Sequence, residues 1–196
     1  ANADDPNMHS SQNEQDNRFY ARFAGIPMLE PANSQEALDM ARAAFTLSES
    51  HGIPVLLRTT TRINHSRSVV EMGALQDSKV KGNFLKDPLN LVPVPMVARR
   101  LHIELLEKLK KLRLEADSSS FNRVEGQGTW GVVTSGVSYN YVMDAIRELN
   151  IADQVQVLKL GMTYPFPQAL CLDFIRKVEK VLVVEELEPF LEDMIK

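Results

Sequence analysis

The chain has 196 residues, of which 44% are hydrophobic and 24% are charged, and its formal net charge is −4 at pH 7. These values are typical of a soluble globular protein with one large domain or two small ones. The acidic balance provides no general attraction to nucleic acid, and no apolar run approaches the roughly 20 residues of a membrane span. There is no secretory signal, so we expect a cytoplasmic protein that binds neither nucleic acid nor membrane.

Cys171 is the single cysteine of the sequence, which excludes an internal disulfide and a cysteine-rich metal site within the chain. Its neighbours are apolar, so we expect a buried, unreactive thiol rather than a reactive one. No phosphate-binding loop, zinc-ligand spacing or serine-hydrolase motif is present.

Residues 4–18 are almost wholly polar and show no apolar periodicity. The segment brings an acid/base group, two carboxylates and a cation close together, and such a set can orient a polar substrate or relay a proton. These groups are His9, Glu14, Asp16 and Arg18, with the amides of Gln12, Asn13 and Gln15 between them. We interpret the segment as a functional loop whose supporting strand lies upstream, in a longer protein. A frayed polar terminus is the alternative.

The next elements follow the order loop, helix, strand. A short helix is expected within residues 19–28, and Asn33 with Glu36 gives a capped start to a second helix that ends at Gly52. Residues 55–60 read as a buried strand, which makes the unit typical of the late half of a doubly wound α/β domain. Beside this strand, Arg58 and Arg62 can bind a carboxylate or phosphate, or pair with an acid across a domain boundary, which we favour slightly.

Residues 61–92 carry few regular signals and read as a connector. Residues 96–116 then predict a helix, because Leu101, Leu105, Leu109 and Leu112 recur at helical spacing. The helix also carries several basic side chains, which we interpret as a solvated face, with nucleic-acid or calmodulin-like binding as the minor alternative.

From residue 129 onward the pattern predicts a βαβαβ unit with a small parallel sheet. The expected strands are residues 130–134, 155–160 and 181–184, and the expected helices are residues 141–149, 170–178 and 187–195. Residues 162–167 read as a turn, Ser138 as a helix cap, and the turn around Gly136 as a plain connection rather than a nucleotide site. Residues 185–188 read as a solvated acidic turn, although strand ends of this kind often bind ligands.

Three passages resemble the α subunits of indolepyruvate:ferredoxin oxidoreductases, which belong to the thiamine diphosphate-dependent 2-oxoacid oxidoreductases. They are residues 4–16, residues 26–36 and residues 54–62. Residues 131–136 and 160–166 are similar to the transketolase C-terminal-like domain of the same enzymes. The likeness runs over essentially the whole chain.

This resemblance implies an α/β fold with three parts. Residues 1–75 would form the second half of a pyrimidine-binding-type domain, residues 76–124 a connector with an amphipathic helix, and residues 125–196 a transketolase C-terminal-like domain. The implied activity is the oxidative decarboxylation of aryl pyruvates such as indolepyruvate to aryl-acetyl-CoA, with ferredoxin as electron acceptor. The implied cofactors are thiamine diphosphate, Mg²⁺ and [4Fe-4S] clusters. The implied partners are the remainder of the α subunit, a β subunit, ferredoxin and coenzyme A.

Parts of the family pattern are absent from the chain: the aminopyrimidine-contacting glutamate, the Gly-Asp-Gly magnesium motif and the cysteine clusters. We therefore expect the chain alone to bind none of these cofactors and to be inactive, and we expect a sheet edge left exposed by the missing half-domain to promote pairing. The resemblance places His9 and Glu14 as catalytic candidates. It places a further set near substrate or cofactor: Ser10, Ser11, Gln12, Asn13, Gln15, Asp16 and Arg18. A non-catalytic assembly module and a related oxidoreductase with another 2-oxoacid substrate are the alternatives.

Overall fold

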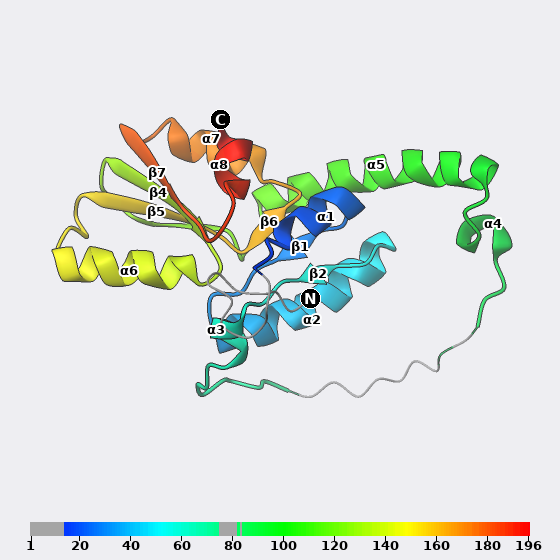
Figure 1. The fold of residues 1–196 in the computed structure, drawn as a ribbon, viewed down its shortest axis with the longest axis horizontal. Helices are drawn as coiled ribbons and strands as arrows, with labels where there is room; N and C mark the ends of the chain where they lie inside the picture. The colour runs from blue at the N-terminus through cyan, green and yellow to red at the C-terminus, as the bar shows by residue number, and fades with distance from the viewer. Residues whose placement is uncertain (1–13, 75–81, 83) are drawn as a thin grey trace.

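The structure, a computed structural model, describes residues 14–74, 82 and 84–196. This part of the chain folds into two small sheets with helices around them (Figure 1). In chain order the elements are α1 (Arg18–Ala24), β1 (Met28–Leu29), α2 (Ser34–His51), β2 (Leu56–Leu57), α3 (Thr61–Asn64), α4 (Pro88–Leu91), α5 (Pro95–Asp117), β3 (Arg123–Gly126), β4 (Trp130–Ser135), α6 (Ser138–Leu149), β5 (Val155–Leu160), β6 (Met162–Tyr164), α7 (Gln168–Ile175), β7 (Lys180–Val184) and α8 (Phe190–Ile195).

The first sheet has the strand order β2-β1-β6. Strands β1 and β2 run parallel, whereas β6 pairs antiparallel with β1. Because β6 follows β5 in the chain, the first sheet contains strands from both halves of the molecule. The expected turn over residues 162–167 is therefore wrong for its first three residues. Strands this short contain too few residues for an apolar alternation to reveal them.

Helix α2 begins and ends as the sequence predicts. The Asn33 side chain accepts a hydrogen bond of 2.9 Å from the Glu36 N–H, and Gly52 closes the helix in the left-handed conformation, with φ of 56°. The strand expected over residues 55–60 shrinks to the two residues of β2, which are half-buried rather than buried. Its position at the edge of the sheet explains both differences, since only one neighbour covers it.

The second sheet has the strand order β3-β5-β4-β7, in which β4, β5 and β7 are parallel. This confirms the predicted βαβαβ unit. Strand β3, which the sequence did not predict, adds to it as an antiparallel edge. Helix α6 lies along one face, while α7 and α8 lie on the other (Figure 1). The Ser138 cap is wrong: Ser138 is the first residue of α6, and Val137 precedes it with no side-chain capping bond.

Helix α5 packs through the predicted leucine stripe. Leu112 is fully buried in a core with Met40 of α2 and Met162 of β6, and Leu105 packs against the same cluster. The basic side chains of α5 are mostly exposed, as a solvated face requires. Cys171 is buried in the core between α7 and the second sheet. Burial raises the pKa of its thiol to about 12, with the Asp117 charge adding to the effect, so the expected unreactive thiol is confirmed.

Among the described residues, no helix has the length and apolar character needed to cross a bilayer.

Candidate functional site

Arg18, the first residue of α1, lies at the centre of a buried ionic cluster. Its side chain is 1% exposed. Its Nε donates to Asp16 Oδ1 at 2.8 Å, its Nη1 to Glu185 Oε2 at 2.6 Å, and its Nη2 to the Glu188 carbonyl at 2.7 Å. The guanidinium also lies 5.2 Å from the centre of the Phe190 ring. Arg18 therefore fastens the segment before α1 to the turn that follows β7.

The charge of Arg18 is well compensated in spite of its burial. Burial by itself lowers the pKa of the guanidinium, but the hydrogen bond to Asp16 and the charges of Glu30 and Glu185 outweigh it, so the net shift is upward. Arg18 is therefore charged, and it binds the carboxylates of Asp16 and Glu185 through hydrogen bonds.

Glu185 is the main anchor on the other side of this cluster. Besides Arg18, its carboxylate accepts hydrogen bonds from the N–H groups of Leu191 at 2.8 Å and Glu192 at 3.1 Å, at the start of α8. Its side chain is 8% exposed. The expectation of a solvated acidic turn is wrong at Glu185, because its carboxylate turns inward and accepts hydrogen bonds from three protein donors.

A second buried pair, Arg58 with Glu30, lies beside the first cluster. Arg58 Nη1 donates to Glu30 Oε1 at 2.7 Å, and Arg58 Nε donates to Asn17 Oδ1 at 2.7 Å. Glu30 and Arg58 directly follow β1 and β2, and because these strands are parallel neighbours, both side chains emerge at the same end of the sheet. The expected pairing of Arg58 with an acid is confirmed, although that acid belongs to the same sheet rather than to another domain.

This end of the sheet has spare hydrogen-bonding capacity. Within the described residues, the buried atoms Glu30 Oε2, Arg58 Nη2 and Thr60 Oγ1 have no hydrogen-bond partner. Thr60 follows Arg58 by two residues, and Glu30 lies close to Gly136, at the end of β4. Since buried polar atoms in folded proteins are nearly always paired, this is a place where polar groups of a ligand, water or further protein can be accommodated.

The predicted site residues fall into three groups. Asp16 and Arg18 are in the buried cluster, while Glu14 and Gln15 are exposed, with Gln15 accepting a hydrogen bond of 3.3 Å from the Tyr20 hydroxyl. The others lie outside the described residues: His9, Ser10, Ser11, Gln12 and Asn13. The sequence interpretation overlooked Asn17 and Glu30 and misjudged Glu185. The last two could have been found as acids that directly follow apolar strand-forming residues.

A separate polar cluster lies at the start of α2. The Lys159 ammonium, on β5, contacts the Glu36 carboxylate and lies 4.8 Å from the centre of the Tyr139 ring. Glu36 also accepts from the Ala32 N–H at 2.8 Å and lies 3.3 Å from Arg123. These contacts join α2 to the second sheet, and we assign the cluster a structural role.

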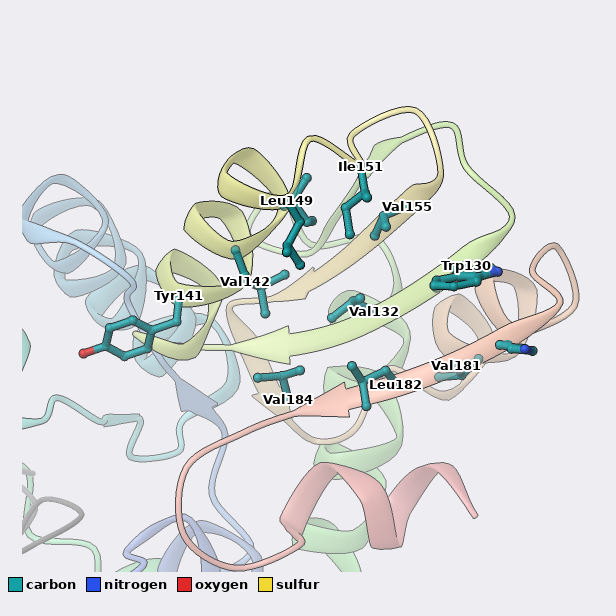
Figure 2. Close-up of a pocket in the computed structure, with 14 residues that line it drawn as sticks. Trp130, Val132, Tyr141, Val142, Leu149, Ile151, Val155, Val181, Leu182 and Val184 are labelled. Atoms are coloured by element: carbon teal, nitrogen blue, oxygen red, sulfur yellow. The ribbon is translucent and has the colours of Figure 1, made fainter.

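An apolar groove of about 500 Å³ lies between α6 and strands β4 and β7 (Figure 2). Val132, Val142 and Leu182 line it, with Trp130 and Tyr141 near its two ends. The lining residues include no carboxylate or histidine. The groove's potential acid/base groups are Lys180 and Tyr141. The buried ionic clusters gather several charged side chains, and we take them as the better candidate site.

No protein-family model matches the chain. Curated proteins do match it. The chain is 52% identical over 193 residues to "Indolepyruvate oxidoreductase subunit IorA" of Methanothermobacter thermautotrophicus, covering 97% of this chain and 31% of that protein. It is 46% identical over 201 residues to the protein of the same name from Thermococcus kodakarensis, covering 99% of this chain and 31% of that protein.

The chain is related to one segment of IorA. The resemblance inferred from the sequence is confirmed. A third relative of this name, from Archaeoglobus fulgidus, is 44% identical over 192 residues. The chain spans about a third of the length of these IorA proteins.

A solved structure agrees with the predicted fold class. A 2-oxoglutarate:ferredoxin oxidoreductase from Magnetococcus marinus matches with a TM-score of 0.65 at 16% identity, over 93% of this chain and 40% of that chain. That structure contains 2-oxoglutarate, coenzyme A and succinyl-CoA. At this identity the match shows the fold alone, so the IorA-like segment has the α/β fold of a 2-oxoacid:ferredoxin oxidoreductase.

Proposed function

We propose that this chain is the part of an indolepyruvate oxidoreductase that holds a polar loop, residues 9–18, at the enzyme's catalytic cleft. The observation that carries the proposal is the identity of 44–53% to IorA proteins over at least 97% of the chain. The complete enzyme would oxidatively decarboxylate an aryl pyruvate such as indolepyruvate to an aryl-acetyl-CoA and pass two electrons to ferredoxin. A related enzyme with another 2-oxoacid is the alternative, since the substrate pocket extends beyond this segment.

The cofactors implied are thiamine diphosphate with Mg²⁺ and [4Fe-4S] clusters. One cysteine cannot ligate a four-iron cluster, and the sequence has no Gly-Asp-Gly magnesium motif, so we assign these sites to other parts of the enzyme. Among the described residues, no group of three or more histidine, cysteine or acidic side chains gathers where a metal could bind. Thiamine diphosphate supplies the electron sink for decarboxylation when bound. This chain would contribute polar groups that orient substrate and cofactor and help exclude water.

His9 and Glu14 are the proposed catalytic residues. A histidine can exchange a proton near neutral pH, so we assign His9 to proton handling or to orientation of the keto acid. Glu14 and Gln15 are exposed to solvent in this structure, so substrate or other parts of the enzyme can reach them. The side chains of Asp16 and Arg18 instead point inward, where Arg18 pairs with both Asp16 and Glu185.

The experiment that tests this proposal is replacement of His9 in the complete oxidoreductase. We expect His9→Ala to lower kcat with indolepyruvate by about 100-fold, the usual scale of a lost acid/base group, with little change in melting temperature. His102→Ala is the matched control, because His102 is an exposed histidine on α5. Unchanged turnover, or equal losses of turnover and stability, would contradict the role of His9.

The chain on its own should not bind the cofactor. Isothermal titration of the 196-residue chain with thiamine diphosphate and Mg²⁺ should show no binding at micromolar concentrations, because the diphosphate and aminopyrimidine contacts are assigned elsewhere. Binding with micromolar affinity would show that this segment carries the main cofactor site, and it would contradict the assignment of that site to other parts of the enzyme.

The alternative to a catalytic role is a non-catalytic role in subunit assembly. The leucine stripe of α5 does not support this role, because Leu105 and Leu112 pack inside the molecule. The observation that favours it is the apolar groove beside β7, where Leu182 is 61% exposed. Leu182→Glu in the complete enzyme would reduce subunit assembly under this alternative and would leave it unchanged if the segment acts only through its polar loop.

A further inference from the structure

The three residues Asp16, Asn17 and Arg18 are held from two directions at once. Arg18 and Asp16 form the cluster with Glu185, beyond β7, and Asp16 Oδ2 also accepts a hydrogen bond of 3.3 Å from the Glu188 N–H. Asn17 is attached to Arg58, beyond β2. The chain just before α1 is thus tied both to the first sheet and to the turn leaving the second.

Asn17 precedes the first residue of α1, but its side chain does not cap the helix. Asparagine at the start of a helix normally accepts a hydrogen bond from an N–H of the first turn. Asn17 occupies that position in α1 but makes no side-chain cap bond, and its Oδ1 accepts from Arg58 Nε at 2.7 Å instead. Asn17 is 4% exposed, so this bond is shielded from water. The residue contributes to fixing the chain before α1 rather than to capping the helix.

Arg58 makes this attachment through two adjacent nitrogens of one planar group. Nε binds Asn17 while Nη1 binds Glu30, and the Glu30 N–H is itself held by the Gly161 carbonyl at 2.8 Å. The guanidinium therefore links Asn17 to Glu30, the residue that directly follows β1. A lysine has the same charge but presents a point-like ammonium, so it cannot reproduce the fork.

We propose that Glu30, Arg58 and Glu185 are positioning residues for residues 14–18, the described part of the polar loop. They fix Asp16, Asn17 and Arg18 where the chain enters α1, and through these residues they place Glu14, which is assigned to chemistry. The proposal rests on the function proposed above. Nothing in it requires these three side chains to touch substrate or cofactor.

The test compares Arg58→Lys and Glu185→Gln in the complete oxidoreductase. Arg58→Lys keeps the charge that compensates buried Glu30, and Glu185→Gln keeps the shape of its side chain, so both variants are chosen to fold. Arg147→Lys is the control, because Arg147 is an arginine whose side chain is 77% exposed and pairs with Asp144 on the surface of α6.

Two readouts are needed. Hydrogen exchange of the peptide that spans residues 14–24 should accelerate by about tenfold in both variants, with peptides from β4 and β5 unchanged, because the opening is local. Turnover should show kcat reduced by about 100-fold, with KM changed far less, as expected when catalytic groups are misplaced. The control should match the unmodified enzyme in both respects.

Unchanged exchange in the variants would overturn the anchoring, and faster exchange with unchanged kcat would overturn the positioning role. Faster exchange throughout the protein would also overturn it, since it would mean a general loss of stability. An unmodified enzyme that fails to oxidise indolepyruvate would refute the proposed function instead, and the exchange measurement would still decide whether the three side chains hold the loop.

Discussion

Lys159 is a buried lysine whose positive charge is compensated by the carboxylate of Glu36. Its side chain is 0% exposed, and burial lowers the pKa of its ammonium in spite of the opposing contact with Glu36. Burial likewise opposes ionisation of Glu36, but the hydrogen bonds from Lys159 and from the Ala32 N–H outweigh it, so the pKa of Glu36 lies below its ordinary value of 4.5.

Removing one partner of this pair should therefore be costly. We expect Lys159→Met to lower the free energy of unfolding by about 3 kcal/mol, because it leaves the Glu36 carboxylate without its main counter-charge. The double variant Lys159→Met with Glu36→Gln should recover most of the loss, because no unpaired charge then remains. Urea denaturation of the three proteins measures both effects, and a double variant as unstable as the single one would contradict the account.

The same pair should make the free energy of unfolding depend on pH in the acid range. The folded-state pKa of Glu36 is lower than its unfolded value, so its contribution is present above pH 4.5 and is lost as the pH falls through the folded-state pKa. The destabilisation by Lys159→Met should thus be larger at about pH 7 than at an acid pH below the folded-state pKa of Glu36, where Glu36 is protonated in both proteins. An equal difference at both pH values would show that packing, not charge, holds Lys159.

Single residues also mark how far the sequence could predict the site. The polar character of residues 14–18 was visible, and so was the pairing of Arg58 with an acid. The direction in which each side chain points was not. Arg18 and Asp16, which are predicted to lie near substrate or cofactor, are buried against Glu185, which lies 167 positions from Arg18 in the chain. Only the fold brings those groups together.

At the level of elements, long periodic segments were predicted well and short ones were not. Helices α2 and α5 and the parallel strands β4, β5 and β7 agree with the sequence pattern within a few residues. Strands β1, β3 and β6 were overlooked, because two to four residues give no periodic signal and their pairing depends on distant partners. Strand β6 follows β5 in the chain and pairs with β1, so it links the two sheets, and this link was the least predictable part of the fold.

A substitution at Gly161, which lies between β5 and β6, tests the packing around the connection of the two sheets. A Cβ there would lie 2.6 Å from Met40 Cε and 2.8 Å from the Phe121 carbonyl oxygen. The backbone oxygen cannot move away easily, because it accepts the Gly161 N–H. We expect Gly161→Ala to destabilise the protein by about 2 kcal/mol, the usual scale of overpacking.

Thermal or urea unfolding measures the effect of Gly161→Ala. Gly82→Ala is the control, because a Cβ at Gly82 would meet no atom within 4 Å. If Gly161→Ala were as stable as the control, the close approach of α2 and residue 121 to the β5–β6 connection would be wrong.

On the scale of the whole molecule, the two sheets are joined by polar as well as apolar contacts. Arg18 with Glu185 and Lys159 with Glu36 each connect the first sheet's surroundings to the second sheet, while Met28 of the first sheet shares a core with Val133 of the second. Buried charge pairs of this kind are sensitive to geometry. They therefore favour one relative placement of the two halves, which a loop positioned at their junction requires.

The central claim is that this junction places the polar loop, residues 9–18, at the catalytic cleft. The most direct measurement is an experimental structure of the complete oxidoreductase with thiamine diphosphate bound. Our account predicts that side chains of this loop contact the cofactor or substrate within about 4 Å, while Asp16, Asn17 and Arg18 keep their bonds to Glu185 and Arg58. A cofactor bound far from this loop, for instance beside the groove of α6 and β7, would contradict it.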